Sequence, residues 1–461
     1  MSKSTTRRGS RHFSPRAGLA ALGVKLRSLQ LFGPIEELVK IEQKVIKDTP
    51  VQKLHDAFIT ILAGAHGLVE INTRLRSDRG LQVAIGRARC AEQSVVQDTL
   101  DACTAANVHQ MEEALDTIYR QHSLAYRHAY QDAWQVLDVD ISGLPCGPKA
   151  AFATKGYFAK QRNRRGRQLG RVLASRYGDI VVDRVFAGTV QLARAFQPLL
   201  RAAEGTLGLD KAQRKRTIVR MDGGGGSLAD VNWALARGYA VHCKDYSATR
   251  AETLAASVTE WVDDPRVPGR QVGWVTLPAP EYVRPVRRLA VRCPKKNGQW
   301  AVGVLVSALA PADVIALTGQ PCDRVADPTA VLLAYVYFYD QRGGGVETSF
   351  REDKQGLGLT KRSKKRFAAQ QMVVYLGTLA HNVLVWARGW LAPALPRLAR
   401  YGLVRFVRDI WGISGFVVRA PARGDLLRIV LNRDAPLAPA LATALHALLT
   451  SEHVAVTSGQ T

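Results

Sequence analysis

The sequence predicts an α/β protein in which a mixed β-sheet flanked by helices is interrupted by a β-rich insertion and preceded by a helical region. Three observations carry this prediction. Apolar residues recur at helical spacing over residues 31–130, strands and helices alternate over residues 133–245, and Pro, Gly and β-branched residues dominate residues 246–330. A chain of 461 residues is long enough for several domains.

The N-terminal part is predicted to hold a basic arm and a helical DNA-binding region. Residues 1–16 are basic and rich in serine, without the apolar segment of a signal peptide, so we expect a disordered cationic arm. Residues 17–132 show helical spacing. Within them, residues 91–100 suit either a recognition helix that turns Gln93, Ser94 and Gln97 toward a groove or the phosphates of DNA, or an ordinary helix of a bundle.

Residues 133–245 are predicted to form the first part of the core. Five short apolar or alternating runs bounded by turn residues indicate strands, and two segments with helical spacing lie between the later ones. The strands are expected at residues 134–143, 168–175, 179–186, 217–221 and 239–243, and the helices at 191–203 and 227–237.

The rest of the chain is divided into a β-rich insertion over residues 246–330, a second part of the core over 331–392 and a C-terminal α+β extension over 393–461. Asn297 and Gly298 predict a hairpin turn in the insertion, because both residues accept positive φ angles. The expected elements are strands at 272–277, 287–293 and 299–307, a long buried helix at 363–391, two strands within 412–432 and a helix at 437–449.

The charge of the chain points to a polyanionic partner. The sequence holds 64 Lys and Arg against 39 Asp and Glu, a net charge of +25, which favours nucleic acid first and an anionic membrane surface second. The longest apolar run, residues 373–387, is interrupted by His381 and Asn382. It is too short for a spanning helix, so we expect a core helix and no membrane partner.

The cysteines indicate a cytoplasmic protein. The six cysteines are scattered and include no Cys-x-x-Cys pair, which argues against a zinc ribbon and a disulfide scaffold.

The glycines at 223–226 fit neither a dinucleotide-binding fingerprint nor a P-loop, and no Gly-x-Ser-x-Gly motif of a serine hydrolase is present.

Acidic residues stand at the ends of predicted core elements. Asp140 ends the first strand, with Asp138 on the same face; Asp222 follows a later strand and precedes four glycines; Glu347 begins a helix after Arg342 and three glycines. Three converging carboxylates repel one another unless cations lie between them. The trio therefore suits two Mg²⁺ or Mn²⁺ ions of the kind that support phosphoryl transfer.

Basic residues accompany these acidic positions. Arg351 and Lys354 fall on the same helical stripe as Glu347, which suits either a metal-plus-phosphate site or a solvated face with ion pairs. Further basic clusters are expected to form cationic walls for substrate phosphates. The candidate phosphate-binding residues in them are Arg164, Arg165, Arg167, Lys361, Arg362, Lys364 and Lys365.

Taken together, these motifs resemble a known family. The order of strands and helices around Asp140, Asp222 and Glu347 resembles the RNase H-like catalytic core of DDE transposases, and the β-rich insertion before the glutamate matches them too. Tyr339-x2-Arg342-x4-Glu347-x6-Lys354 resembles the Tyr–Arg–Glu–Lys signature of the bacterial "insertion sequence four" group, which usually has three residues between Arg and Glu. The stretches at 220–239 and 337–362 carry the likeness, which covers about residues 90–420.

The resemblance implies a function for each motif. Asp140, Asp222 and Glu347 would bind two Mg²⁺ or Mn²⁺ ions, with Asp138 as the rival for the first position. Tyr339, Arg342 and Lys354 would contact phosphates near the cleaved end. In some members a Trp of the insertion stacks on a flipped base, and the candidates here are Trp274 and Trp300.

The implied reaction is hydrolysis at a transposon end, which releases a 3′-hydroxyl that then attacks target DNA. The implied partners are double-stranded DNA, as terminal inverted repeats and as target, and a second copy of the chain. The implied location is the bacterial cytoplasm, in association with the nucleoid. Two alternatives stay open: a catalytically retired DNA-binding protein, and a structure-specific nuclease with the same core.

Overall fold

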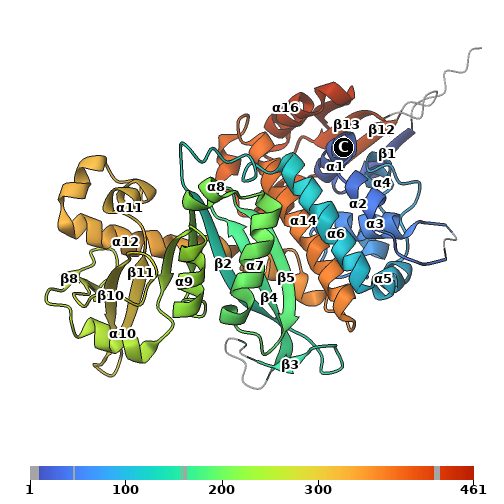
Figure 1. Ribbon diagram of the computed structural model, residues 1–461. Coiled ribbons are helices and arrows are strands. Elements are labelled where there is room, and N and C mark those ends of the chain that lie inside the picture. Colours follow the sequence, from blue (N-terminus) through green and yellow to red (C-terminus); the bar gives the residue numbers. More distant parts are fainter. Residues whose placement is uncertain (1–9, 45–46, 157, 159–163, 420–425, 461) are drawn as a thin grey trace, which may run out of the picture. The chain divides into compact units, whose positions relative to one another are not determined.

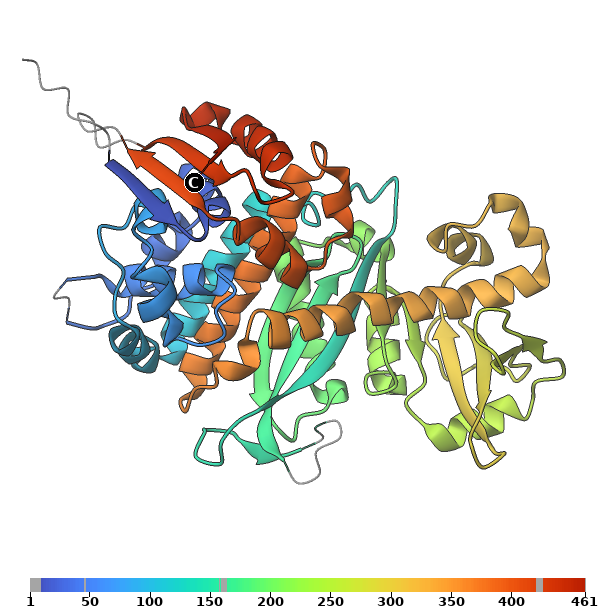
Figure 2. The same ribbon diagram turned by 180° about the vertical axis from the view of Figure 1, so that it is seen from behind.

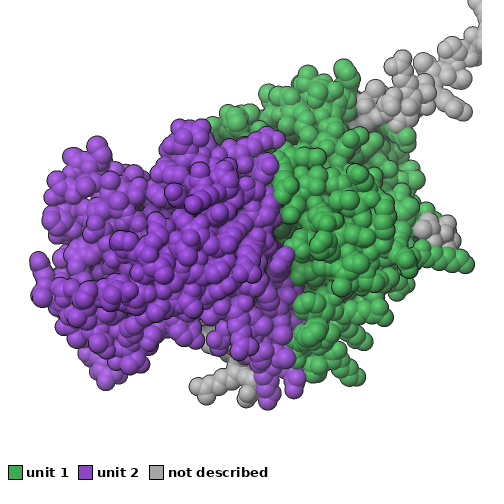
Figure 3. Space-filling model, in the orientation of Figure 1, with its two compact units in different colours: residues 1–123, 145–153, 351–461 green, residues 124–144, 154–350 purple. Residues whose placement is uncertain are grey.

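The computed structural model describes residues 10–44, 47–156, 158, 164–419 and 426–460 (Figure 1). The chain divides into two compact units, coloured separately in Figure 3: unit 1 comprises residues 1–123, 145–153 and 351–461, and unit 2 comprises residues 124–144 and 154–350. This grouping differs from the predicted boundaries. The predicted helical region, the long helix after residue 351 and the C-terminal extension all contribute to unit 1.

Unit 2 is built on a mixed sheet flanked by helices, as the sequence predicts. Within its described residues, ten strands follow the order β3-β4-β2-β6-β7-β11-β10-β9-β8, with β5 paired to β4. Strand β2 pairs in parallel with β6, and β6 in parallel with β7, whereas β4 and β5 are antiparallel. The first six strands are β2 (Gln135–Pro145), β3 (Thr154–Lys155), β4 (Arg165–Ala174), β5 (Asp179–Ala187), β6 (Thr217–Met221) and β7 (Ala240–Lys244).

The insertion extends this sheet. Its strand β11 pairs antiparallel with β7, with Leu305 opposite Lys244. The sheet continues across the insertion because β7 offers its free edge to β11 (Figures 1 and 2). Gly298 has a φ of 78° in the predicted hairpin turn. The insertion strands are β8 (Val262–Asp263), β9 (Gln271–Trp274), β10 (Arg287–Pro294) and β11 (Trp300–Ser307).

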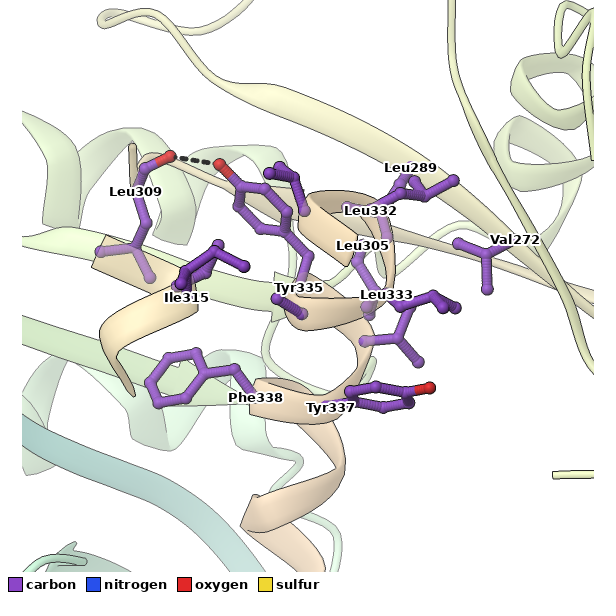
Figure 4. Close-up of a cluster of buried hydrophobic side chains, with 14 of the residues drawn as sticks. Val272, Leu289, Leu305, Leu309, Ile315, Leu332, Leu333, Tyr335, Tyr337 and Phe338 are labelled. Carbon is purple, nitrogen blue, oxygen red and sulfur yellow. Dashed lines mark hydrogen bonds between the residues drawn. The ribbon is translucent and has the colours of Figure 1, made fainter. Parts of the chain in front are cut away.

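Helix α12 (Pro328–Arg342) anchors the core of this half of unit 2. Asp327 caps its first turn by accepting hydrogen bonds from the backbone N–H groups of Thr329 and Ala330, and Pro328 suits the first helical position. Its apolar face packs on β9–β11, and the Tyr335 hydroxyl donates a 2.7 Å hydrogen bond to the Leu309 carbonyl (Figure 4). The other helices of unit 2 include α7 (Leu192–Leu207), α8 (Lys211–Lys215), α9 (Leu228–Ala236), α10 (Ala248–Ala255) and α11 (Pro311–Leu317).

Unit 1 packs helices around the long, mostly buried helix α14 (Phe367–Leu391). Helices α3, α5 and α6 contact α14, and the two ribbon views show α6 beside it (Figures 1 and 2). None of the described helices is long and apolar enough to cross a bilayer. The remaining helices include α1 (Ala17–Ser28), α2 (Gly33–Leu38), α3 (Pro50–Leu62), α4 (Arg79–Ala84), α5 (Gln93–Ala102), α6 (Ala105–His122), α15 (Leu403–Phe406) and α16 (Ala438–Leu448).

A four-stranded sheet joins the two ends of the chain within unit 1. Its order is β1 (Ser10–Ser14), β12 (Gly415–Arg419), β13 (Leu426–Asn432) and β14 (Ala455–Gly459). The prediction of a disordered arm over residues 1–16 is therefore wrong for residues 10–14, because β12 supplies hydrogen-bond partners that the local sequence cannot reveal. Residues 1–9 of that arm, and residues 420–425 within the two strands predicted at 412–432, lie outside the described residues.

The three residues considered for DNA recognition have different environments on α5. Gln97 donates a 2.8 Å hydrogen bond to Asp101 and accepts one from the ammonium of Lys364. Gln93 is half-buried, and Ser94 is exposed. These contacts favour the alternative reading of α5 as a helix of the bundle.

Candidate active site

Two of the predicted acidic residues lie side by side on neighbouring strands. Strands β2 and β6 pair in parallel as far as Val139 opposite Met221, and the next residues along them are Asp140 and Asp222. Neighbouring strands are about 4.8 Å apart. Asp140 does not end its strand as predicted, because β2 continues to Pro145. Asp222 follows β6 directly and accepts a 2.9 Å hydrogen bond from the Gly224 backbone N–H.

Asp138 has a different environment, although it lies only two residues before Asp140. It faces Arg220 across the same strand pair and accepts hydrogen bonds of 2.7 and 2.9 Å from that guanidinium. The hydroxyl of Ser175 also donates to it. Asp138 is fully buried, so its charge is neutralised inside the protein by a dedicated partner.

Glu347 does not begin a helix. Helix α12 ends at Arg342, and the chain continues without a break through a π-helical turn (Gly343–Glu347) into α13 (Thr348–Arg351). The three glycines before Glu347 are thus part of the helical segment. Glu347 is the last residue of the π-helical turn, and its side chain is 56% exposed.

Arg342 connects the third acidic residue to the first. Its Nη1 donates to Asp140 Oδ2 at 3.1 Å and its Nη2 donates to Glu347 Oε1 at 2.9 Å. The guanidinium is buried and lies 5.9 Å from the centre of the Tyr339 ring. The fold therefore brings Asp140, Glu347 and Tyr339 together around Arg342.

The environment of Asp140 disfavours its ionised form. Burial raises the pKa of Asp140 to about 6, the Arg342 guanidinium opposes this rise, and the neighbouring Asp222 adds to it. Burial likewise raises the pKa of Tyr339 to about 12. The charges of Asp140, Asp222 and Glu347 raise the pKa of Arg342, which stays a cation.

The acidic residues suit a divalent cation by donor type. Carboxylate oxygens are the ligands that Mg²⁺ and Mn²⁺ prefer, and a cation next to Asp140 and Asp222 would relieve their repulsion. Within the described residues, however, no three His, Cys, Asp or Glu side chains have the spacing of a formed metal site. Arg342 occupies the space between Asp140 and Glu347, so metal binding requires the half-exposed Glu347 to turn from Arg342 toward the strand carboxylates.

Lys244 is a basic residue of this region that the sequence analysis does not single out. It ends β7 directly after Cys243, which faces Met221, so it lies opposite Asp222. Its exposed side chain lies over Gly303, where an added Cβ would come within 2.8 Å of its Cε. The neighbouring Asp245 pairs with Arg250 instead, at 2.6 Å. A cation at the end of the strand after Asp222 is a signal that the sequence does contain.

The predicted phosphate-binding residues of unit 2 divide into exposed and buried ones. Arg164 and Arg165 are exposed, as expected. Arg167 is only 1% exposed, so the prediction that it contacts DNA from the surface is wrong. Arg165 and Arg167 share one face of β4, but Arg165 is the first residue of the strand, whereas Arg167 lies within the run from Gly166 to Ala174 that is buried throughout.

The predicted basic residues after Glu347 belong to unit 1. Arg351, Lys361 and Lys365 are exposed, whereas Lys354 is half-buried in a second π-helical turn (Glu352–Gly356). Regular helical spacing, which the single stripe of basic residues assumed, does not continue through that turn.

Arg362 and Lys364 are structural residues of unit 1, against the prediction. Arg362 is 3% exposed and donates to the backbone carbonyls of Ala65 and Leu357. Lys364 is 8% exposed, and its Nζ donates a 2.5 Å hydrogen bond to Gln97. Both cations satisfy distant groups in the fold, which a run of basic residues in the sequence cannot indicate.

The two tryptophans considered for base stacking differ in their exposure. Trp274 packs against the core and meets the Tyr335 ring edge-on, with 5.5 Å between ring centres. Trp300 is 41% exposed, and the guanidinium of Arg292 lies 4.5 Å from its ring centre. Of the two, Trp300 has the accessible ring.

Comparison with solved structures identifies a distant structural neighbour. No protein-family model matches the chain, and no curated protein matches it. Among solved structures, the chain is similar to a piggyBac transposase in a synaptic complex with hairpin DNA, determined by cryo-EM. The identity is 13% and the TM-score 0.45, over 87% of this chain and 82% of that one.

Proposed function

We propose that the protein is a DDE transposase that cuts the ends of a DNA element and joins them to target DNA. The observation that carries the proposal is the meeting of Asp140 and Asp222 on neighbouring parallel strands, with Arg342 linking Asp140 to Glu347. A buried carboxylate beside a second carboxylate destabilises a fold through their repulsion, so the position of the buried Asp140 next to the half-buried Asp222 favours a site that handles cations and phosphate.

In this proposal Asp140, Asp222 and Glu347 hold two Mg²⁺ or Mn²⁺ ions, and Asp138 does not, because Arg220 engages it. Such ions activate a nucleophile and stabilise a leaving oxygen in phosphoryl transfer. Arg342 holds Glu347 close to Asp140 until Glu347 turns toward the ions, and its guanidinium is then available for a phosphate oxygen, for which its planar donor set is suited. Tyr339 and Lys244 contact the same DNA strand near the cleaved bond.

The proposed reaction has two balanced steps. In the first, water attacks the phosphodiester at the element's end, forms one P–O bond and releases the DNA 3′-hydroxyl. In the second, that hydroxyl attacks a phosphodiester of target DNA and displaces another 3′-hydroxyl. Exposed cations such as Arg164, Arg165, Lys361 and Lys365 and a net charge of +25 hold the polyanion.

The partners in this proposal are double-stranded DNA and a second copy of the chain, which together bring two terminal inverted repeats into one complex. The resemblance of the signature around Arg342 and Glu347 to that of bacterial insertion-sequence transposases supports placing the element in this group. The protein would then work in the bacterial cytoplasm, on DNA of the nucleoid.

A plasmid that carries the DNA on both sides of the gene tests the proposal. We expect Mg²⁺-dependent cleavage at inverted repeats and joined products, both reduced at least about 100-fold in Asp140→Ala, Asp222→Ala and Glu347→Ala. Asp132→Ala, which removes an exposed carboxylate of the same unit, is the control with unchanged activity.

Three outcomes would overturn the proposal. Full activity in all three variants would remove the site assignment. Cut ends without joined products would identify a structure-specific nuclease. DNA binding without cleavage under any divalent ion would identify a retired, DNA-binding relative.

A further inference from the structure

The contact between Arg342 and Glu347 conflicts with regular helix geometry. In an α-helix each residue turns by about 100°, so two residues five apart point roughly 140° away from each other. Arg342 and Glu347 are five apart in a continuous helical segment, yet their side chains form a 2.9 Å hydrogen bond. The backbone between them must therefore depart from the α-helix.

A π-helical turn over Gly343–Glu347 supplies this departure. Its hydrogen bonds join residues five apart, so it places Glu347 above Arg342. In an unbroken α-helix, the residue four positions on would take that place. That residue is Val346, whose side chain is instead fully buried. The turn thus decides that a carboxylate, rather than an isopropyl group, faces Arg342 and Asp140.

Both flanks of the turn are held by packing. On the N-terminal side, Tyr335 and Phe338 are buried in the core of unit 2. On the C-terminal side, the Ser349 hydroxyl accepts a 3.0 Å hydrogen bond from Arg171, whose guanidinium lies 4.6 Å from the Phe350 ring centre. Neither flank can rotate to absorb an extra residue, so the excess is confined to the turn.

The glycines suit this role. An added Cβ at Gly344 would meet no atom within 4 Å, whereas one at Gly345 would come within 3.0 Å of Asp138 Oδ2. The turn therefore fits against the buried Asp138 at one glycine and has open space at the next. Gly344 is therefore the glycine of the run whose removal loses no close contact with neighbouring atoms.

We propose that the run Gly343-Gly344-Gly345 holds one residue in excess of an α-helix and that the π-helical turn keeps Glu347 in register with Arg342 and Asp140. Gly344 is then the excess residue of the run and takes no part in the site itself; the effect of the register on cleavage rests on the proposed function. Removing Gly344 closes the segment into an α-helix, in which Arg342 and the glutamate are four residues apart and still on one face. Adding a residue leaves two residues in excess between the held flanks, which one π-helical turn does not absorb, so the glutamate loses its register with Arg342.

Three variants of the full chain test the proposal: deletion of Gly344, insertion of one glycine after Gly344, and Gly344→Ala, which keeps the length. We expect the deletion and Gly344→Ala to cleave within about tenfold of the wild-type rate, since the Arg342–Glu347 pair persists at helical spacing. We expect the insertion to remain folded in thermal unfolding and to lose cleavage to the level of Glu347→Ala.

A double-mutant cycle provides a readout independent of activity. Arg342→Ala and Glu347→Ala, alone and combined, are compared by the midpoints of urea unfolding in the wild-type, deletion and insertion chains. We expect the two substitutions to be non-additive in the wild-type and deletion chains and additive in the insertion chain.

An additive cycle in the deletion chain, an unfolded deletion variant, or an insertion variant that cleaves normally would overturn the proposal. Wild-type protein and Asp140→Ala are assayed in parallel. If the wild type shows no metal-dependent cleavage, or if Asp140→Ala cleaves as well as the wild type, the proposed function fails. The unfolding cycle still shows whether Glu347 is in register with Arg342.

Discussion

Asp138 and Arg220 face each other across strands β2 and β6 and are joined by hydrogen bonds of 2.7 and 2.9 Å. This buried pair separates two aspartates that the sequence presents as equivalents. Asp138 has a guanidinium of its own, whereas Asp140, two residues on, shares Arg342 with Glu347 and lies beside Asp222. The two residues should therefore respond differently to substitution.

Asp138→Ala should destabilise the fold strongly, because it leaves the Arg220 guanidinium buried without its counter-charge. Removing one partner of a buried pair costs about 3–5 kcal/mol, measurable as a drop in the free energy of unfolding in urea. The double variant Asp138→Leu/Arg220→Met should recover most of this loss. A single variant as stable as the wild type would contradict the structural role of the pair.

Asp140→Asn should stabilise the protein above pH 6. A carboxyl whose pKa rises from 3.8 in the unfolded chain to about 6 in the fold contributes stability at low pH, and this is lost as the pH rises through about 6. Above that pH the free energy of unfolding of the variant should exceed that of the wild type by on the order of 1–3 kcal/mol. Its unfolding temperature should be correspondingly higher. Below about pH 4 the two proteins should converge.

The exposed Asp132→Asn is the control for the Asp140 experiment, since it removes a carboxylate without removing a buried charge. A gain of stability for Asp140→Asn that does not change between pH 4 and pH 8 would show that lost charge is not its cause.

Arg342→Ala should make the stability of the protein depend on Mg²⁺. The substitution leaves Asp140 and Glu347 without their shared cation, at a cost of about 1.5–3 kcal/mol for the lost charged hydrogen bonds. A divalent ion can replace that charge, so Mg²⁺ should raise the unfolding temperature more in the variant than in the wild type. Arg342→Lys, which keeps the charge but not the planar donor set, should show an intermediate response. Equal shifts in all three proteins would contradict the account.

Lys244→Ala should weaken DNA binding by removing one phosphate contact. The slope of log affinity against log salt should fall by about 1, and Lys244→Arg should keep it. Cleavage by the Ala variant should fall further than binding, because the contact lies next to Asp222. Lys295→Ala, in the hairpin turn of the insertion, is the matched control that removes the same charge far along the sheet from Asp222. An equal loss of cleavage in both variants would show that Lys244 acts only through the net positive charge of the protein.

Trp274→Ala and Trp300→Ala should separate a core residue from a surface residue. Trp274 packs against Tyr335, so its removal should cost about 3 kcal/mol of stability. Trp300 is exposed beside Arg292, and its removal should cost at most about 1 kcal/mol. If Trp300 stacks on a base, Trp300→Ala alone should remain folded and lose end processing. The lost stacking should weaken DNA binding by about 1–3 kcal/mol. Normal processing by Trp300→Ala would exclude this role.

The sequence was sufficient where the signal is local. Apolar alternation and turn residues predicted the strands observed as β2, β4, β5, β6 and β7 to within a few residues. The position of Asp222 directly after β6 follows from the same pattern, because a short apolar run that ends in a carboxylate and glycines needs no distant information. The hairpin turn at Gly298 is of the same kind.

The tertiary structure decided every question that depends on a partner far along the chain. Arg220 on β6 distinguishes Asp138 from Asp140, Ala65 and Gln97 account for the burial of Arg362 and Lys364, and β12 orders residues 10–14. The π-helical turn belongs to this group too, since packing at both flanks confines one extra residue to Gly343–Glu347. A carboxylate or a cation has the same local sequence whether it is paired in the core or free for substrate. Only the groups that the fold brings against it determine which of the two it is.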